Sequence, residues 1–446
     1  MTRTRRYVKK QAKAMTRRRL NAQERHAYQQ KQAQRDIEAL RQALDDLGLP
    51  DNLVLEIEGR LRAQKKLLGK IVGLMFPTLF GCIHAYELSR TRGGDKNLPA
   101  RLLGALPKRS WLKRLRRLGQ DVLGALWRHS EAKSAATRSR WPWTWVLDDS
   151  VFRQYGSQLE LVGTGWSGQH KRVVDGIDGV LLLVVIGDGK LVGPVDFAVR
   201  RPNPQGPGRR CRTKLEWAQV MLDETLAALR RRGLDLPAPL VVADSWLSDS
   251  KLMAHVAATH QGTLLVQGKA TYTFYLEDGC KVKRAALIDE AREWPFRQSL
   301  HAPACRYARL RATSPTYGEV TVLVVDKPGE KRFYLLCFAT PLQATRLLRL
   351  WSRRHWIEHV FRTLKHLLAT DACQVHREDA YYGHLVLRLM ACFVLFYTSR
   401  VIFKGQVTMD EMVFNLNHHW SSVNCQELEL YGLSQGPERK PTPMLA

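Results

Sequence analysis

The sequence has no uninterrupted apolar run of the roughly 18 residues that a membrane-spanning helix requires. Its longest apolar stretches are GVLLLVVI, which covers 179–186, and LMACFVLFYT at 389–398. Both are predicted to be buried core elements. A membrane is therefore not an expected partner.

Paired cysteine motifs are also absent. The eight cysteines are scattered without a C-x-x-C pair, so neither a zinc knuckle nor a disulfide framework is indicated. This usage fits a reducing compartment, and a cytoplasmic location is expected. The eight are Cys82, Cys211, Cys280, Cys305, Cys337, Cys373, Cys392 and Cys425.

Acidic residues are scarce relative to basic ones. The 446 residues include 70 Lys and Arg against 42 Asp and Glu, a net charge of +28. The segment MTRTRRYVKKQAKAMTRRRL at the start holds no acidic residue, and LPKRSWLKRLRRLG forms a second basic cluster. A transit peptide would explain only the first of these clusters. A polyanionic partner is implied, and nucleic acid is the default one.

Helical periodicity dominates residues 1–140. Apolar residues recur at intervals of three and four positions in three segments. These are AQRDIEALRQALDDLGL, the segment at 51–76 and SWLKRLRRLGQDVLGALWRH. Each helix alone could simply present a solvated charged face. Together they predict a basic, all-helical DNA-binding domain.

From 141 the pattern changes to short apolar runs separated by Gly and Pro. WTWVLDD, GVLLLVVIGDG and KLVGPVDFAV predict three strands, followed by a long helix, the strand PLVVAD, a short helix and the strand GTLLVQG. This order predicts an RNase H-like α/β core whose first part covers 141–268. Its strands are apolar enough to be covered on both faces.

The remaining chain is predicted to complete this core around an insertion. Residues 269–331 are irregular and strand-rich, and are expected to form an inserted segment. Residues 332–400 would return to the core with one strand and a final helix, and 401–446 would form a C-terminal tail.

Two strands end in aspartate followed closely by serine. WVLDDS carries Asp148 and Asp149, and LVVADS carries Asp244. Ligands bind at the carboxyl ends of strands in open α/β sheets, although a single strand-end Asp is more often a turn or cap residue. In the predicted topology the two strands are neighbours, so that Asp148 or Asp149 faces Asp244. The side chains of Asp148 and Asp149 should point to opposite faces, so only one is expected to join a site.

A third carboxylate lies in RRHWIEHVFRTLK at 353–365, which can be interpreted in two frames. His355, Glu358 and His359 match the H-x-x-E-H zinc-peptidase pattern. Two His four apart suit one helix face, but no accessory third ligand is evident. The other frame places Trp351, Arg354, Glu358, Arg362 and Lys365 on one stripe of a regular helix, opposite a buried apolar face.

The second frame adds Glu358 to the two strand-end sites. Three converging carboxylates would repel one another unless divalent cations lay between them. Oxygen-only ligands suit Mg²⁺ or Mn²⁺. Two such ions could support phosphodiester cleavage and transfer.

These residues resemble the DDE transposases of bacterial insertion sequences, in the large family with a Tyr-Arg-Glu-Lys signature. The signature spacing matches Trp351, Arg354, Glu358 and Lys365, with Trp in the place of Tyr. The resemblance covers roughly 145–397, including the insertion before the glutamate helix. It implies a nucleoid-associated bacterial protein with an RNase H-like core.

The resemblance also implies roles for single residues. Asp148, Asp244 and Glu358 would be catalytic and would hold two Mg²⁺ or Mn²⁺ ions. Arg354 and Lys365, with Trp351, would contact the DNA of the transposon end. A Trp can stack but cannot offer a phenol hydroxyl.

Two further assignments follow from the family pattern. Its motif of Asp, any residue, then Ser or Thr selects Asp148, with Ser150 two residues later, over Asp149. The family stacks an insertion-domain tryptophan on a flipped base, and Trp294 is the nearest candidate, although it could equally be a core residue.

The expected function is therefore that of a transposase. It would bind the terminal inverted repeats of its element as double-stranded DNA, then cleave and transfer strands, also to target DNA, as a homodimer in the DNA complex. Alternatives are a catalytically inactive DNA-binding relative, a nuclease without end specificity, and an H-x-x-E-H zinc peptidase.

Overall fold

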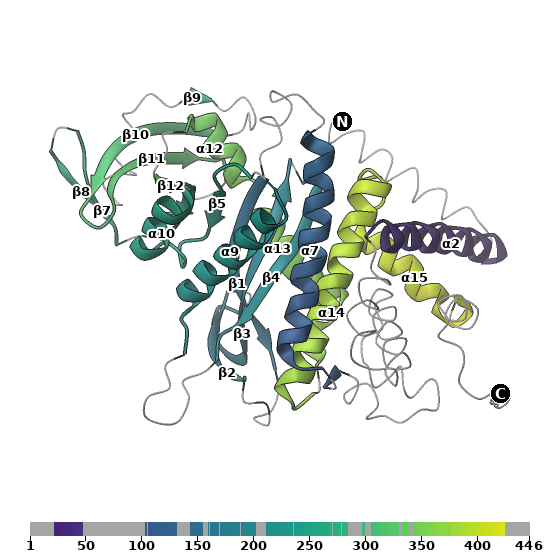
Figure 1. Ribbon diagram of the computed structural model, residues 1–446. Coiled ribbons are helices and arrows are strands. Elements are labelled where there is room, and N and C mark those ends of the chain that lie inside the picture. Colours follow the sequence, from purple (N-terminus) through teal and green to yellow (C-terminus); the bar gives the residue numbers. More distant parts are fainter. Residues whose placement is uncertain are drawn as a thin grey trace.

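The computed structural model describes most of the chain from 143 onward and two earlier helical segments (Figure 1). The described residues are 22–47, 103–131 and 143–423, apart from gaps at 105, 155–158, 160, 169, 188, 202–210, 235, 270, 278, 284–296, 299–304, 330–331, 339–341 and 374. The predicted helix at 51–76, Trp294, and the tail beyond 423 lie outside them.

The described residues form a mixed α/β fold around one large, mostly antiparallel sheet. Its first strands are β1 (Trp143–Arg153), β3 (Arg172–Ile186) and β4 (Leu191–Val199), with β3 antiparallel to both of the others. On its other side β1 pairs in parallel with β5 (Leu240–Ala243), which pairs in parallel with β6 (Thr263–Gln267). The spatial order is therefore β4, β3, β1, β5, β6.

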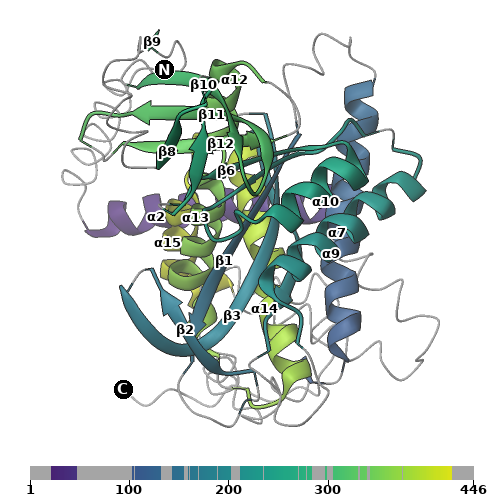
Figure 2. The same ribbon diagram turned by 90° about the vertical axis from the view of Figure 1, so that its left-hand side faces the viewer.

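The apolar runs explain why these strands are central. Every residue of β4, and all of β3 from Gly176 to Ile186, is buried. Helices cover both faces, as Figure 2 shows: α9 (Lys214–Arg231) and α10 (Ser250–His260) lie on one side of the strands, and α13 (His355–Arg362) lies on the other. This double cover agrees with the prediction from the uniformly apolar strands.

The strand-rich insertion extends this sheet. Strand β12 (Phe333–Phe338) pairs with β6, β11 (Gly318–Asp326) pairs with β12, and β10 (Arg306–Ser314) follows. The shorter strands at the margin are β7 (Thr273–Tyr275), β8 (Lys281–Lys283) and β9 (Arg297–Gln298). The described strands of 269–331 therefore belong to the same hydrogen-bonded sheet as β6 and β12.

One strand outside the insertion was not predicted. Strand β2 (Gly163–Ser167) pairs with the first part of β3 and forms an exposed hairpin. Its sequence, GTGWS, is too rich in glycine and too short to give a strand signal. Trp166 on this hairpin is 56% exposed.

Helix α7 (Lys108–Glu131), which was predicted to belong to a basic helical domain covering 1–140, packs into the hydrophobic core (Figure 1). Its Trp111 is fully buried, and Gly383 of the helix at Glu378–Tyr397 lies directly against the indole. Its Arg116 Nε lies 2.9 Å from Oδ1 of the fully buried Asp196 on β4. Part of the basic cluster in α7 is thus paired with acidic groups of the core.

Helix α14 (Glu378–Tyr397) is the apolar segment that was predicted to be buried. With its continuation η3 (Thr398–Ile402) it is long and apolar enough to cross a membrane, by length and composition alone. However, 78% of its apolar 18-residue stretch is buried inside the protein. It contacts α7 and β4 as a core helix, and α2 (Ala22–Asp46) and α15 (Met409–Val423) pack beside it (Figure 1).

Candidate functional site

Three aspartate side chains meet where β1 passes the end of β5. The parallel pairing of the two strands runs from Thr144 with Leu240 to Leu147 with Ala243. Asp148 and Asp149 follow on one strand and Asp244 on the other. One carboxylate oxygen from each of the three lies within 4.8 Å of the other two. The predicted proximity of these aspartates is therefore observed, but β1 continues to Arg153, so Asp148 and Asp149 lie within the strand and not at its end. We refer to Asp148, Asp149 and Asp244 as the carboxylate cluster.

Both neighbouring aspartates join the cluster, and the prediction that only one could do so is wrong. Oδ1 of Asp148 accepts a hydrogen bond from the backbone N–H of Asp149 at 2.9 Å, so this carboxylate folds over the following peptide. Asp149 is drawn inward by an ion pair, its Oδ2 lying 2.5 Å from Lys214 Nζ. A local hydrogen bond of Asp148 and an ion pair of Asp149 thus accompany the departure from simple alternation of faces within β1.

Lys214 and Asp178 were not predicted as parts of this site. Lys214 is the first residue of α9, and its Nζ also lies 2.9 Å from Oδ2 of Asp178 on β3. Burial tends to lower the pKa of Lys214, but the carboxylates of Asp149 and Asp178 outweigh it and raise the pKa. Lys214 is therefore a resident cation at the edge of the carboxylate cluster.

The clustering perturbs the acids themselves. Burial, reinforced by the charges of Asp244 and Asp149, raises the pKa of Asp148 to about 7 although Arg354 opposes the shift. Burial, with the charge of Asp149, also raises the pKa of Asp244. Two backbone N–H groups, of Trp246 and Leu247, donate to Oδ1 of Asp244 and fix its orientation. Such an array favours either a bound proton or a bound cation.

The segment with the third carboxylate is an interrupted helix, not the regular helix that was predicted. Helix α12 (Ala344–Trp351) stops, a tight turn covers 352–354, and α13 begins at His355. In the turn the Ser352 hydroxyl donates to Arg349 O at 2.8 Å, and the buried Arg353 donates to Thr144 Oγ1 on β1 at 2.6 Å. These two side-chain hydrogen bonds compete with regular helix geometry.

Arg354 connects this helix to the carboxylate cluster. Its Nη2 lies 3.2 Å from Asp148 Oδ2, and its Nη1 lies 2.5 Å from Glu358 Oε1. Glu358 is not in the group of carboxylates that meet within 4.8 Å among the described residues. It approaches Asp148 through the Arg354 guanidinium, and its side chain is 53% exposed.

The other two signature residues lie on either side of Arg354 and Glu358. The Arg354 guanidinium carbon lies 5.5 Å from the ring centre of the partly buried Trp351. Lys365 belongs to a π-helical turn, η1 (Thr363–Leu367), and its Nζ lies 5.6 Å from the ring centre of Phe152. Burial lowers the pKa of Lys365. Arg354 and Lys365 thus both contact residues of β1, Arg354 at Asp148 and Lys365 at Phe152.

The zinc-peptidase frame gains no support. His355 Nδ1 contacts Ser352 O, and the rings of His355 and His359 pack edge to face with centres 5.4 Å apart. Neither histidine belongs to a group of three metal-ligating side chains in the part of the chain that the structure describes.

An exposed aromatic side chain borders the cluster and was not predicted. Trp246 lies two residues after Asp244 and is 66% exposed. Its backbone N–H is held by the Asp244 carboxylate at 2.9 Å. Because it is exposed beside the carboxylate cluster, Trp246 is a candidate contact for a ligand bound there.

Comparison with known proteins adds no assignment. No model of a known protein family matches the chain, and no curated protein matches it. The geometry of the site therefore carries the functional argument.

The donor set of the carboxylate cluster fits hard divalent cations. It offers only carboxylate oxygens, which suit Mg²⁺ or Mn²⁺, and its close negative charges would be relieved by a bound cation. Asp148, Asp149 and Asp244 are the residues that could hold such an ion. Glu358 could join them if its ion pair with Arg354 were broken.

Proposed function

We propose that this protein is a transposase of the DDE type, which cleaves and transfers DNA strands at the ends of its own insertion sequence with Mg²⁺ or Mn²⁺. The observation that carries the proposal is the meeting of Asp148, Asp149 and Asp244 beside Arg354 and Glu358. The aspartates of β1, Asp244 after β5 and the signature helix are far apart in the sequence, and their proximity supports the proposal of one site.

The strand order supports an RNase H-like core. Three antiparallel strands, β4, β3 and β1, continue into two parallel strands, β5 and β6, with α9 and α10 as the connecting helices. Asp244 directly follows the carboxyl end of β5, where open α/β sheets bind ligands. Asp148 and Asp149 lie beside it in the middle of β1. The long sheet extension before α12 takes the place of the insertion.

In this proposal the protein's own groups position the DNA. Divalent ions held by the carboxylates would activate an attacking oxygen and stabilise the leaving oxygen. Arg354 and Lys365 would pair with phosphates of the transposon end, and Trp351 would pack beside Arg354. The net charge of +28 would attract the duplex, so binding should weaken steeply as salt rises.

The test is Mg²⁺-dependent cleavage of linear DNA that carries the flanking sequences of the gene, with wild-type protein and Glu358→Gln. Cuts at the repeat ends that disappear in the variant, while DNA binding survives, are expected. Unrelated DNA as competitor separates a transposase from a nuclease without end specificity. A wild-type protein that binds but never cuts would reduce the proposal to that of a DNA-binding relative.

A further inference from the structure

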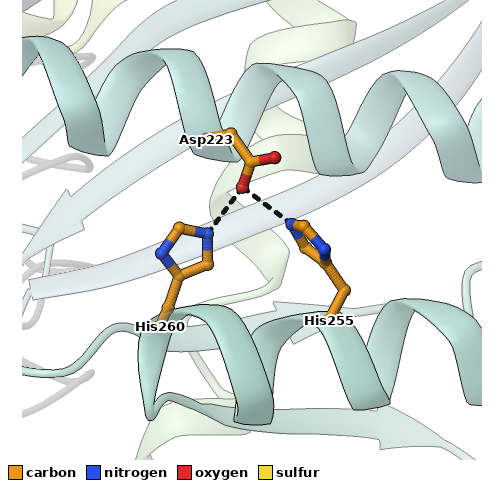
Figure 3. A group of neighbouring side chains, drawn as sticks. All are labelled: Asp223, His255 and His260. Carbon is orange, nitrogen blue, oxygen red and sulfur yellow. Dashed lines mark hydrogen bonds and ion pairs between the residues drawn. The ribbon is translucent and has the colours of Figure 1, made fainter.

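A second cluster of metal-ligating side chains lies between α9 and α10 (Figure 3). Asp223 projects from the middle of α9, and His255 and His260 project from α10, of which His260 is the last residue. One ligand atom from each residue lies within 4.8 Å of the other two. We propose that Asp223, His255 and His260 form a binding site for a transition-metal ion, with Zn²⁺ as its occupant.

The three side chains converge on one point. Nε2 of His255 lies 2.7 Å and Nε2 of His260 lies 2.6 Å from the same oxygen, Oδ1 of Asp223. The two rings stand edge to face, with centres 5.5 Å apart. Helix packing therefore brings two imidazole nitrogens and a carboxylate oxygen together before any ion is present, so little rearrangement is required to bind one.

The donor types select zinc over the ions expected at the carboxylate cluster. Two imidazoles and one carboxylate are a common ligand set for Zn²⁺, whereas Mg²⁺ prefers oxygen alone. When Nε2 of a histidine binds a metal, its Nδ1 carries the proton and donates it to a neighbouring group. For His255 the acceptor is present, because the Thr259 hydroxyl lies 3.4 Å from Nδ1.

Burial shows how an ion would enter. The His260 side chain is only 4% exposed, and its Nε2 contacts Asp223. Its Nδ1 makes no hydrogen bond to any described residue. The side chains of Asp223 and His255 are 40% and 22% exposed. One side of the cluster is thus anchored in the protein and the other faces solvent, which can supply a water as fourth ligand.

The place of the site suggests a bracing role. Helix α9 begins with Lys214, which pairs with Asp149, and α10 begins a few residues after Asp244. An ion bound by Asp223, His255 and His260 would link these two helices far from the carboxylates. It would stabilise the scaffold that supports the carboxylate cluster without touching a substrate there.

The experiment is a zinc titration of the full chain after removal of metals with a chelator. The protein carries Asp148→Asn and Asp244→Asn, so that the carboxylate cluster does not compete for the ion. Calorimetry with a competing chelator gives the stoichiometry and affinity, and Co²⁺ substitution reports tetrahedral nitrogen and oxygen ligands by its visible absorption. One equivalent of Zn²⁺ is expected, together with a rise in melting temperature.

Two variants separate a metal site from a hydrogen-bonded contact between helices. Asp223→Asn keeps a side-chain oxygen that can accept from both histidines but loses the charge, and His255→Ala removes a partly exposed ligand. Each should weaken Zn²⁺ binding at least tenfold and reduce the rise in melting temperature at the same Zn²⁺ concentration. His170→Ala, an exposed histidine on the turn between β2 and β3, should bind as the parent does.

The proposal is overturned if the parent binds no Zn²⁺, or if His255→Ala and His170→Ala bind it equally well. The measurement uses no DNA, so its failure would leave the proposed transposase function untouched. Conversely, a protein that cuts no DNA could still bind zinc at this site.

Discussion

Arg354 Nη2 lies 3.2 Å from Asp148 Oδ2, which links the helical signature segment to the middle of β1. The same guanidinium holds Glu358 at 2.5 Å through Nη1. A planar guanidinium can serve two carboxylates at once, and the ammonium of lysine cannot reproduce that geometry. Arg354 thus sets the distance between two of the three proposed catalytic acids.

The variant Arg354→Lys keeps the charge and loses this bridge. We expect DNA binding to persist and the cleavage rate to fall at least about tenfold, which corresponds to about 1.4 kcal/mol of activation free energy. Single-turnover cleavage and binding by fluorescence anisotropy measure the two effects. Arg346→Lys, at an exposed position of α12, is the control and should cleave normally. Normal cleavage by Arg354→Lys would contradict the bridging role.

Lys214 gives a second prediction, because it neutralises Asp149 and Asp178. In Lys214→Met the carboxylates lose this cation, so the metal-free protein should melt at a lower temperature. Added Mg²⁺ should then raise the melting temperature more than it does in wild type. Differential scanning fluorimetry over a Mg²⁺ series measures this, with the exposed Lys251→Met as control. Equal rises in melting temperature in all three proteins would show that Lys214 and a divalent ion do not neutralise the same carboxylates.

Trp246 and Trp166 form a matched pair of exposed tryptophans, at 66% and 56% exposure. If Trp246 stacks on a base near the carboxylate cluster, Trp246→Ala should weaken binding of end DNA by about 1–3 kcal/mol. Trp246→Phe should recover part of the loss. Trp166→Ala, on the β2 hairpin, should bind as wild type does. Equal weakening by both alanine variants would assign no special role to Trp246.

The buried Asp196 should make the free energy of unfolding depend on pH, independently of the carboxylate cluster. Burial raises its pKa to about 6, although Arg116 opposes the shift. Because the folded state holds this proton more tightly than the unfolded state, the contribution of Asp196 is fully present below pH 4. It is lost as pH rises to about 6.

The check is urea unfolding of wild type and Asp196→Asn from pH 4 to pH 7. The free energy of unfolding of wild type, relative to the variant, should fall by up to about 3 kcal/mol over this range. A difference between the two proteins that is constant with pH would show that Asp196 does not titrate in this way.

Much of the site was accessible from sequence because its acids end apolar runs. The runs before Asp148 and Asp244 predicted adjacent strands, and the parallel pairing of β1 with β5 confirms that adjacency. The part that Asp149 plays could not be predicted, because it depends on Lys214, which lies 65 residues away and is placed by tertiary packing. Simple alternation along a strand gave the wrong answer there.

Two other features depend on contacts that leave no periodic signal. The turn at 352–354 is held by Arg353 on Thr144, an interaction across 209 residues, so the helical wheel predicted a regular helix. Helix α7 was expected to belong to a separate basic domain, but Arg116 pairs with a buried acid of β4. The charge pattern indicated a basic surface. It could not distinguish basic side chains that face solvent from those that pair with buried acidic side chains.

The central claim is that the carboxylate cluster performs metal-dependent DNA cleavage. The most direct measurement compares Mg²⁺-dependent cutting of the gene's flanking DNA by wild type, Asp244→Asn and Asp175→Asn, an exposed carboxylate of β3 outside the cluster. We expect Asp244→Asn to lose cutting at the element's ends while its folding and DNA binding persist. Asp175→Asn should cut normally. Cutting by Asp244→Asn at the wild-type rate would contradict the central claim.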